Sequence, residues 1–187
     1  MNLTDSALVE QVLSGNKDAF EEIVQRHQHR VYYVALSRLR DRYEAEDLAQ
    51  ETFIQAYRKL ASYDSRYSFR SWLLTICVNR GKNRLRSLAR RNRAYRAHRE
   101  VSSGEVHGPD QELVALREAI YQIPEKLRLP LVLKHVEGFS YEEVADIMRI
   151  SISAAKMRVR RARDALVQNM KPGTRNPEPS IRQGSIS

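Results

Sequence analysis

Apolar residues recur with a helical period along almost the whole chain, and one interior stretch interrupts that period. Between residues 99 and 109 it gives way to Ser102-Ser103-Gly104 and Gly108-Pro109, which are typical of a loop. No series of alternating apolar and polar residues predicts strands. We therefore predict an all-α chain of two small helical bundles joined by a flexible linker. The predicted parts are residues 1–97 and 110–170 as bundles, 98–109 as the linker and 171–187 as a disordered tail.

Polar residues with short side chains mark where several helices should begin. Thr4 or Asp5 can cap a first helix, and Asn16 can cap the next. Ser68 is expected to open a long helix whose first half is apolar on one side. Pro130 lies inside an apolar run, so a break or kink is expected there.

Positive charge is concentrated in two blocks, although the net charge is only +9. Residues 66–99 hold 11 Lys and Arg and no Asp or Glu, and residues 150–187 hold 8 against 2. The segments before each block are net acidic. Two basic blocks favour two contacts with a polyanion such as nucleic acid. A basic linker with a basic tail would give the same charge pattern, so this alternative stays open.

Several classes of protein are disfavoured by what the chain contains. Cys77 is the single cysteine, which excludes an intramolecular disulfide, and its apolar neighbours predict a buried, inert thiol. No apolar stretch approaches the roughly 18 residues of a membrane span, and the first residues do not resemble a signal peptide. His27 and His29 are two apart and point to different sides of a helix. We expect a cytoplasmic protein without enzymatic activity, cofactor or metal.

The most specific local pattern is the run from Gly138 to Met148. Ser140 and Glu143 have the spacing of a capping box, and Ser151 can cap a second helix after a tight connector. A short helix, a tight turn and a second helix with a basic outer side predict a helix-turn-helix that enters a major groove. An ordinary helical hairpin with solvated arginines is the alternative. The buried stripe of the second helix is expected at Ala155, Val159, Ala162 and Leu166.

A second pattern lies near residue 47, where Glu44, Asp47, Gln50 and Glu51 recur at helical spacing. They predict one acidic and amide face, opposite an apolar stripe. Such a face could be a pair of catalytic carboxylates, a metal site or solvated surface. Since no histidine has a metal-pairing offset to these carboxylates, an enzyme is disfavoured.

Three segments together resemble the extracytoplasmic-function sigma factors, which are promoter-recognition subunits of bacterial RNA polymerase. The run from Glu46 to Tyr57 is similar to their polymerase-clamp-binding helix, and Ser68–Leu73 with Asn79-Arg80 resembles their helix for the downstream promoter element. Ile123–Arg128 with Gly138–Ala145 is similar to their fourth region. The resemblance covers roughly residues 1–170, in the family's order.

The resemblance implies a subunit that binds core RNA polymerase, directs promoter recognition, DNA melting and transcription initiation, and has no catalysis of its own. It also implies an anti-sigma partner. The loop from Tyr63 to Ser68 would hold a base flipped from the non-template strand. The residues implied to bind core polymerase are Asp47, Gln50, Glu51 and Phe53. Those implied for the downstream element are Tyr63, Asp64, Ser65, Arg66, Tyr67, Asn79, Arg80, Asn83 and Arg86. Those implied for the upstream element are Lys134, Tyr141, Glu142, Lys156, Met157, Arg158, Arg160 and Arg161.

Two residues depart from the family pattern. Met157 replaces a small polar residue at an implied DNA contact, which predicts an unusual upstream element. Arg149 replaces the usual turn glycine, which would put a non-glycine residue into a strained connector. A free-standing helix-turn-helix regulator, dimeric on a palindromic site, is the alternative function.

Overall fold

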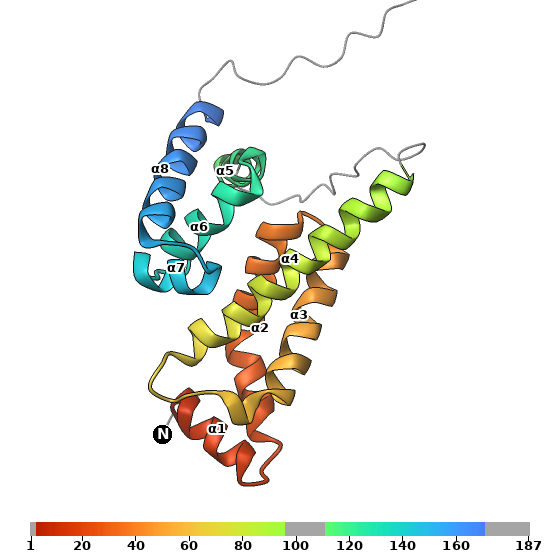
Figure 1. The fold of residues 1–187 in the computed structure, drawn as a ribbon, viewed down its shortest axis with the longest axis vertical. Coiled ribbons are helices and arrows are strands. Elements are labelled where there is room, and N and C mark those ends of the chain that lie inside the picture. Colours follow the sequence, from red (N-terminus) through yellow and green to blue (C-terminus); the bar gives the residue numbers. More distant parts are fainter. Residues whose placement is uncertain (1–2, 96–110, 171–187) are drawn as a thin grey trace, which may run out of the picture.

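The computed structural model describes residues 3–95 and 111–170, with side chains described over 3–90 and 115–170. Every regular element within these ranges is helical, which confirms the predicted fold class (Figure 1). The predicted linker at 98–109 and the predicted tail lie outside the described residues. The elements are α1 (Asp5–Leu13), α2 (Ala19–Leu39), α3 (Arg42–Arg58), the short 3-10 helix η1 (Leu60–Ser62), α4 (Phe69–Tyr95), α5 (Gln111–Gln122), α6 (Glu125–His135), α7 (Tyr141–Met148) and α8 (Ile152–Asn169).

Helices α1 to α4 form the N-terminal unit, in which the long α4 crosses both α2 and α3 (Figure 1). Its centre is built from fully buried aliphatic side chains such as Ile23, Val31, Leu48 and Leu73. Cys77 lies in the same core, and burial raises the pKa of its thiol to about 12. The prediction of a buried, inert thiol is therefore confirmed.

Helices α5 to α8 form the C-terminal unit, which has a small core of its own and packs against the N-terminal unit. Its own cluster contains Ile123, Leu131, Val159 and Ala162. In addition, α6 packs against α2 and α7 packs against α4, so that C-terminal residues such as Phe139 join the larger core. The two units thus share one apolar interior.

A buried arginine joins the units by hydrogen bonds. The side chain of Arg128 in α6 is 1% exposed, and its Nε donates to the carbonyl oxygen of Ser37 near the end of α2. Its Nη1 donates to the carbonyls of Tyr121 at 2.9 Å and Ile123 at 2.7 Å. Burial lowers the pKa of Arg128 to about 10.

A second arginine, Arg38 of α2, forms an ion pair with Glu125 of α6 at 3.1 Å. Its stem passes against Gly81 of α4, where an added Cβ would lie 2.6 Å from Cδ of Arg38. Gly81 therefore gives α4 the space to cross α2 at this point.

Two expected local features are wrong. Asn16 does not cap α2: the cap residue is Asp18, without a side-chain hydrogen bond, and the Asn16 amide donates to Gln11 instead. Pro130 does not interrupt α6, which runs unbroken through it. Proline removes one backbone donor, and burial of the surrounding apolar side chains outweighs that loss.

The other expected starts are confirmed. Thr4 caps α1, its hydroxyl accepting a hydrogen bond from Ala7, and α4 begins directly after Ser68. Within the described residues, no helix combines the length and the apolar character that a membrane crossing requires.

Candidate functional site

The predicted helix-turn-helix is formed by α7, a three-residue turn and α8. Ser140 and Glu143 make the reciprocal hydrogen bonds of a capping box, and Ser151 caps α8. Arg149 adopts a left-handed conformation with φ 53°, as its replacement of a turn glycine predicts. The amide of Ile150 then donates to the carbonyl of Ala145 at 3.0 Å, which closes the end of α7.

Helix α8 turns a small-residue stripe inward and cations outward. Ala155, Val159 and Ala162 are buried as predicted, whereas Leu166 is half-buried. Met157 is 46% exposed, so a thioether lies among the exposed cations of the outer side. The exposed residues from the predicted upstream set are Lys156, Met157, Arg160 and Arg161, and Arg158 is half-buried.

Four of the predicted upstream residues come together from three helices. The ring of Tyr141 in α7 has Lys134 Nζ of α6 at 4.9 Å and Lys156 Nζ of α8 at 5.8 Å from its centre. Both distances suit a cation–π contact. Hydrogen bonds from its own amide and from Ser140 hold the pKa of the Glu142 carboxyl below its usual range, and the two lysines add to this.

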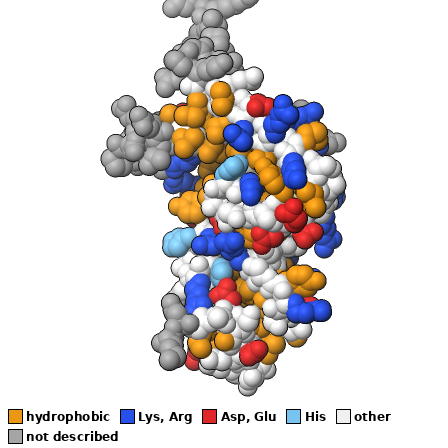
Figure 2. All heavy atoms as spheres, turned by 90° about the vertical axis from the view of Figure 1, so that its left-hand side faces the viewer, with side chains coloured by type: hydrophobic (Ala, Val, Ile, Leu, Met, Phe, Trp, Pro, Cys, Tyr) orange, Lys and Arg blue, Asp and Glu red, His pale blue; other side chains and the backbone are white. Residues whose placement is uncertain are grey.

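Figure 2 views the molecule from the side that carries α7 and α8. On this face Lys and Arg side chains lie among hydrophobic and acidic ones and do not form one continuous basic surface. A mixed surface of this kind suits selective contacts with base edges and phosphates better than uniform charge attraction.

In the N-terminal unit, the carboxylates of α3 pair with arginines of α4. Arg84 forms ion pairs with Glu44, with Asp47 at 2.9 Å and with Glu51 at 3.2 Å. Glu51 also pairs with Arg80 at 2.5 Å. The hydrogen bond to Glu44 raises the pKa of the Arg84 guanidinium, which keeps it charged. Arg84 was not among the residues expected from the sequence.

The predicted acidic and amide face of α3 is therefore divided between two surroundings. Glu44, Asp47 and Glu51 turn toward α4, whereas Gln50 lines an open groove between α2 and α3. The groove has a volume of about 480 Å³, and Phe53, 8% exposed, forms part of its apolar wall. Its other lining residues are Val24, Gln28, His29, Tyr32, Glu46 and Ala49.

The loop before α4 combines one packed and one exposed tyrosine. The Tyr63 ring lies 5.2 Å from that of Phe69 and 5.5 Å from that of Trp72, and its hydroxyl donates to the carbonyl of Tyr67. The Tyr63 ring is therefore packed against the start of α4 and supports the loop. Tyr67 is 68% exposed.

Asp64 organises the rest of this loop. Its carboxylate accepts hydrogen bonds from the backbone and guanidinium of Arg66, and these lower the pKa of the Asp64 carboxyl. Ser65 and Arg66 are exposed. The loop thus presents an aromatic ring and a cation beside each other, in a shape held by local hydrogen bonds.

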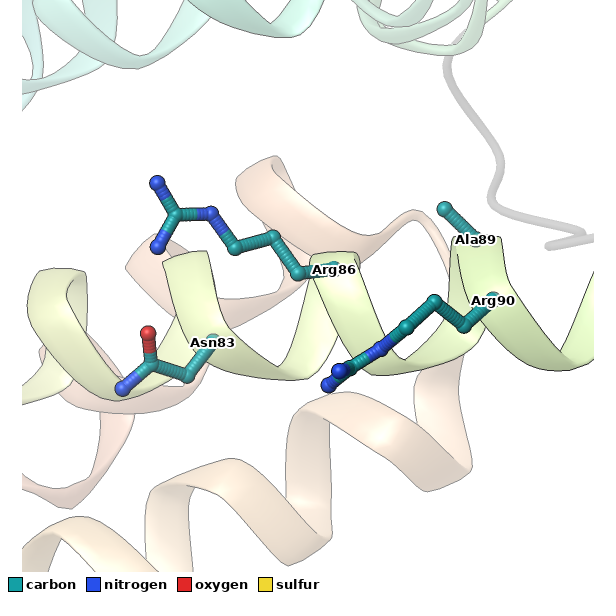
Figure 3. Close-up of a pocket in the computed structure, with 4 residues that line it drawn as sticks. All are labelled: Asn83, Arg86, Ala89 and Arg90. Carbon is teal, nitrogen blue, oxygen red and sulfur yellow. The ribbon is translucent and has the colours of Figure 1, made fainter.

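Farther along α4, Asn83, Arg86, Ala89 and Arg90 line an open depression of about 490 Å³. Figure 3 shows that all four come from α4 and that both arginine side chains extend back along the helix toward Asn83. Asn79 is half-buried, and Arg80 is held by Glu51. Within the described residues, no group of three or more His, Cys, Asp or Glu is arranged to hold a metal ion.

Two protein-family models match the two units. The model of sigma-70 region 2 matches residues 23–91, and that of sigma-70 region 4 matches residues 113–166. The first match begins within α2 and ends within α4, and the second contains α7, the turn and most of α8.

Named relatives match over nearly the whole chain. The chain is 35% identical to the ECF RNA polymerase sigma-E factor of Haemophilus influenzae, covering 91% of this chain and 97% of the relative. It is 32% identical to the RNA polymerase sigma-H factor of Pseudomonas aeruginosa, covering 90% and 94%.

Solved structures agree with these matches. The sigma factor RpoE of Bartonella quintana, in a co-crystal with the anti-sigma factor NepR, is 27% identical with a TM-score of 0.73, covering 82% of this chain and 98% of that one. CnrH, in complex with the cytosolic domain of CnrY, is 30% identical with a TM-score of 0.64, covering 88% and 95%. With both regions present in order, the chain belongs to the extracytoplasmic-function sigma factors of bacterial RNA polymerase.

Proposed function

We propose that this sigma factor binds core RNA polymerase through α3 and the groove between α2 and α3. The groove offers the Phe53 ring and the Gln50 amide, and Asp47, with a side chain 62% exposed, lies on the same helix. Apolar side chains of a partner would complement the groove, and cationic ones could pair with the exposed Asp47 carboxylate. The observation that carries the proposal is the separation of an acidic, grooved α3 from a cationic α8.

The loop from Tyr63 to Ser68 and the following α4 are proposed to bind the opened strand of the downstream element. The exposed Tyr67 ring can stack on an unpaired base, and Arg66 beside it can bind a phosphate once it leaves the Asp64 carboxylate. Tyr63 supports the loop from behind through Phe69 and Trp72. Asn83 and Arg86 would hold the adjacent backbone from their depression on α4.

Helix α8 is proposed to read the upstream element in the major groove. Arg160 and Arg161 are exposed and can reach guanine edges or phosphates, and Met157 offers an apolar contact for a thymine methyl group. Tyr141 holds the ammonium groups of Lys134 and Lys156 near the start of α8, where they can meet phosphate.

We also propose that an anti-sigma protein controls this chain. The similar RpoE and CnrH structures are complexes, one with the anti-sigma factor NepR and one with the cytosolic domain of CnrY. Because initiation takes place where the polymerase and the chromosome are, we infer a cytoplasmic location. Members of the family lack catalytic activity of their own, so binding surfaces carry the whole function.

Reconstitution tests this proposal. Purified core polymerase with the full chain should start transcription at defined positions in a genomic promoter library, and core alone should not. Asp47→Ala should weaken binding to core about tenfold without weakening DNA binding by the free chain. Asp18→Ala, an equal loss of charge at an exposed position of the same unit, is the matched control. No specific start across the library, or a larger loss of DNA binding than of core binding in Asp47→Ala, would contradict the proposal.

A further inference from the structure

One carboxylate lies between the two surfaces that the proposed function gives to different partners. Glu51 belongs to the set proposed for polymerase, and Arg80 to the set proposed for DNA. The side-chain oxygens of Glu51 are divided between two arginines of α4: Oε2 accepts from Arg80 and Oε1 accepts from Arg84. Polymerase would therefore contact one partner of the Glu51–Arg80 ion pair, and a DNA phosphate would contact the other.

The two arginines depend on Glu51 to different degrees. Arg84 also pairs with Glu44 and Asp47, so it remains bound to α3 if Glu51 is taken away. For Arg80, Glu51 supplies the one ion pair formed within the described residues, and the Arg80 Nε is buried without a hydrogen-bond partner. Loss of Glu51 would thus release Arg80 while Arg84 keeps α3 and α4 together.

The exposure of this pair suits exchange of partners. The side chains of Arg80 and Glu51 are 36% and 38% exposed, so water and a partner's charged groups can reach both. Half-exposed ion pairs are weak enough to be replaced by another charged partner of similar strength. A cationic side chain of polymerase for Glu51 and a phosphate for Arg80 would replace the one ion pair between them with two.

We propose that Glu51 is a coupling residue, which holds Arg80 along α3 in the free protein and releases it when polymerase binds. This inference rests on the proposed function, because it uses the assignment of α3 to polymerase and of Arg80 to DNA. Binding of polymerase then strengthens the hold of α4 on the DNA backbone. By linkage, DNA strengthens polymerase binding by the same factor. Arg84 is the positioning residue that preserves the contact between α3 and α4 during the exchange.

The test uses the full-length chain and a short fluorescein-labelled single-stranded DNA at low ionic strength, where electrostatic attraction makes binding measurable. Glu51→Gln mimics the loss of the carboxylate charge without changing its shape. It should tighten DNA binding about twofold to fivefold, the effect of one exposed ion pair, and steepen the dependence of affinity on salt by about one phosphate contact. Glu10→Gln removes the same charge from an exposed position of α1 for which the described side chains form no ion pair, and should leave the affinity unchanged.

A double-mutant comparison distinguishes failure of the proposed DNA contact of Arg80 from failure of its coupling to Glu51. Arg80→Gln should have little effect on DNA binding in the parent chain, where Glu51 holds Arg80, and should cancel the gain in the Glu51→Gln background. If Arg80→Gln leaves the DNA binding of the Glu51→Gln chain unchanged, the assignment of Arg80 to DNA fails and the coupling fails with it. If Arg80→Gln weakens DNA binding by the parent chain and Glu51→Gln behaves like Glu10→Gln, the proposed function survives and the coupling alone is overturned. Circular dichroism of each variant checks that the helices are intact.

Discussion

The two basic helices, α4 and α8, hold their cations in different ways. On α4, Arg80 and Arg84 are tied to carboxylates of α3. On α8, the described side chains form no ion pair, and Lys156 rests over the Tyr141 ring, a contact that leaves its charge intact. A count of positive residues treats the two helices alike. The difference shows that the number of cations available to phosphate depends on the neighbouring helix.

The two units also differ in how they are stabilised. The core of the N-terminal unit is formed mostly by its own side chains. The C-terminal unit has a smaller cluster of its own, and its other apolar side chains pack against α2 and α4. Arg128, buried between the units, adds one hydrogen bond across this contact, to the carbonyl of Ser37. We therefore expect the C-terminal unit to be more sensitive to changes at the boundary.

The largest effect is expected from Phe139→Ala, at the point where the two units meet. Phe139 is 0% exposed, and the guanidinium of Arg70 lies 4.2 Å from its ring centre. Removing a buried aromatic ring should lower the free energy of unfolding by about 3–5 kcal/mol in urea titrations. Val136→Ala, at a residue 67% exposed, should change it by less than about 0.5 kcal/mol.

The same variant tests whether the units depend on each other. The thiol of Cys77 is buried in the N-terminal unit, so its alkylation rate reports the opening of that unit. A shared core predicts faster alkylation in Phe139→Ala. Unchanged alkylation together with loss of the C-terminal helices would mean that the units fold separately.

A smaller loss is expected from Arg128→Met, which keeps the length of the side chain and removes its donors. The carbonyls of Ser37, Tyr121 and Ile123 lose their partner, which should lower the free energy of unfolding by about 2–3 kcal/mol in thermal melts. Lys126→Met, on an exposed position of the same helix, is the control. Equal losses in both variants would show that the buried hydrogen bonds contribute nothing.

Lys156→Gln is expected to have a moderate effect, on DNA binding and not on folding. Because Lys156 is exposed and forms no ion pair with the described side chains, the free chain should lose about threefold to tenfold in affinity for a promoter duplex. The slope of log affinity against log salt should fall by about 0.9. Arg80→Gln should cost the free chain less, since Arg80 must first leave Glu51. Fluorescence anisotropy across a salt series would reveal a reversed order, which would contradict the comparison.

The smallest effect concerns Glu137, which is buried between α6 and α7 near Arg30 of α2. Burial raises the pKa of the Glu137 carboxyl above its ordinary 4.5. A raised pKa in the folded state gives stability that is complete below pH 4.5 and is lost as the pH rises through the folded pKa. Glu137→Gln cannot ionise and so keeps its stability as the pH rises. The difference between its melting temperature and that of the parent chain should therefore grow in its favour from about pH 4.5 to 7. A constant difference across this range would count against the raised pKa.

Much of the local structure could be predicted from residue pattern alone. Helical period, the capping box of Ser140 and Glu143, and the cap at Ser151 involve residues within one or two turns of each other, so spacing in the chain specifies them. The same holds for Arg149, where the turn between α7 and α8 requires a left-handed residue whatever side chain occupies it. The break that was predicted as one outcome at Pro130 is absent, because burial outweighed the local rule.

Contacts between distant segments had no signal in the pattern. Arg84 is 33 residues from Glu51 and 40 from Glu44, and the spacing within α3 does not tell which helix its carboxylates will meet. Three further features depend likewise on how whole helices cross. Gln50 faces a different side of α3 from Asp47 and Glu51, the Tyr63 ring is packed, and Arg128 is buried. Hydrophobic period and capping act within a few residues, so they establish the helices and the helix-turn-helix, and a count of charged residues establishes the two basic blocks. Ion pairs and buried donors act across the packed interior, so only the tertiary arrangement determines which of those basic residues remain available to DNA.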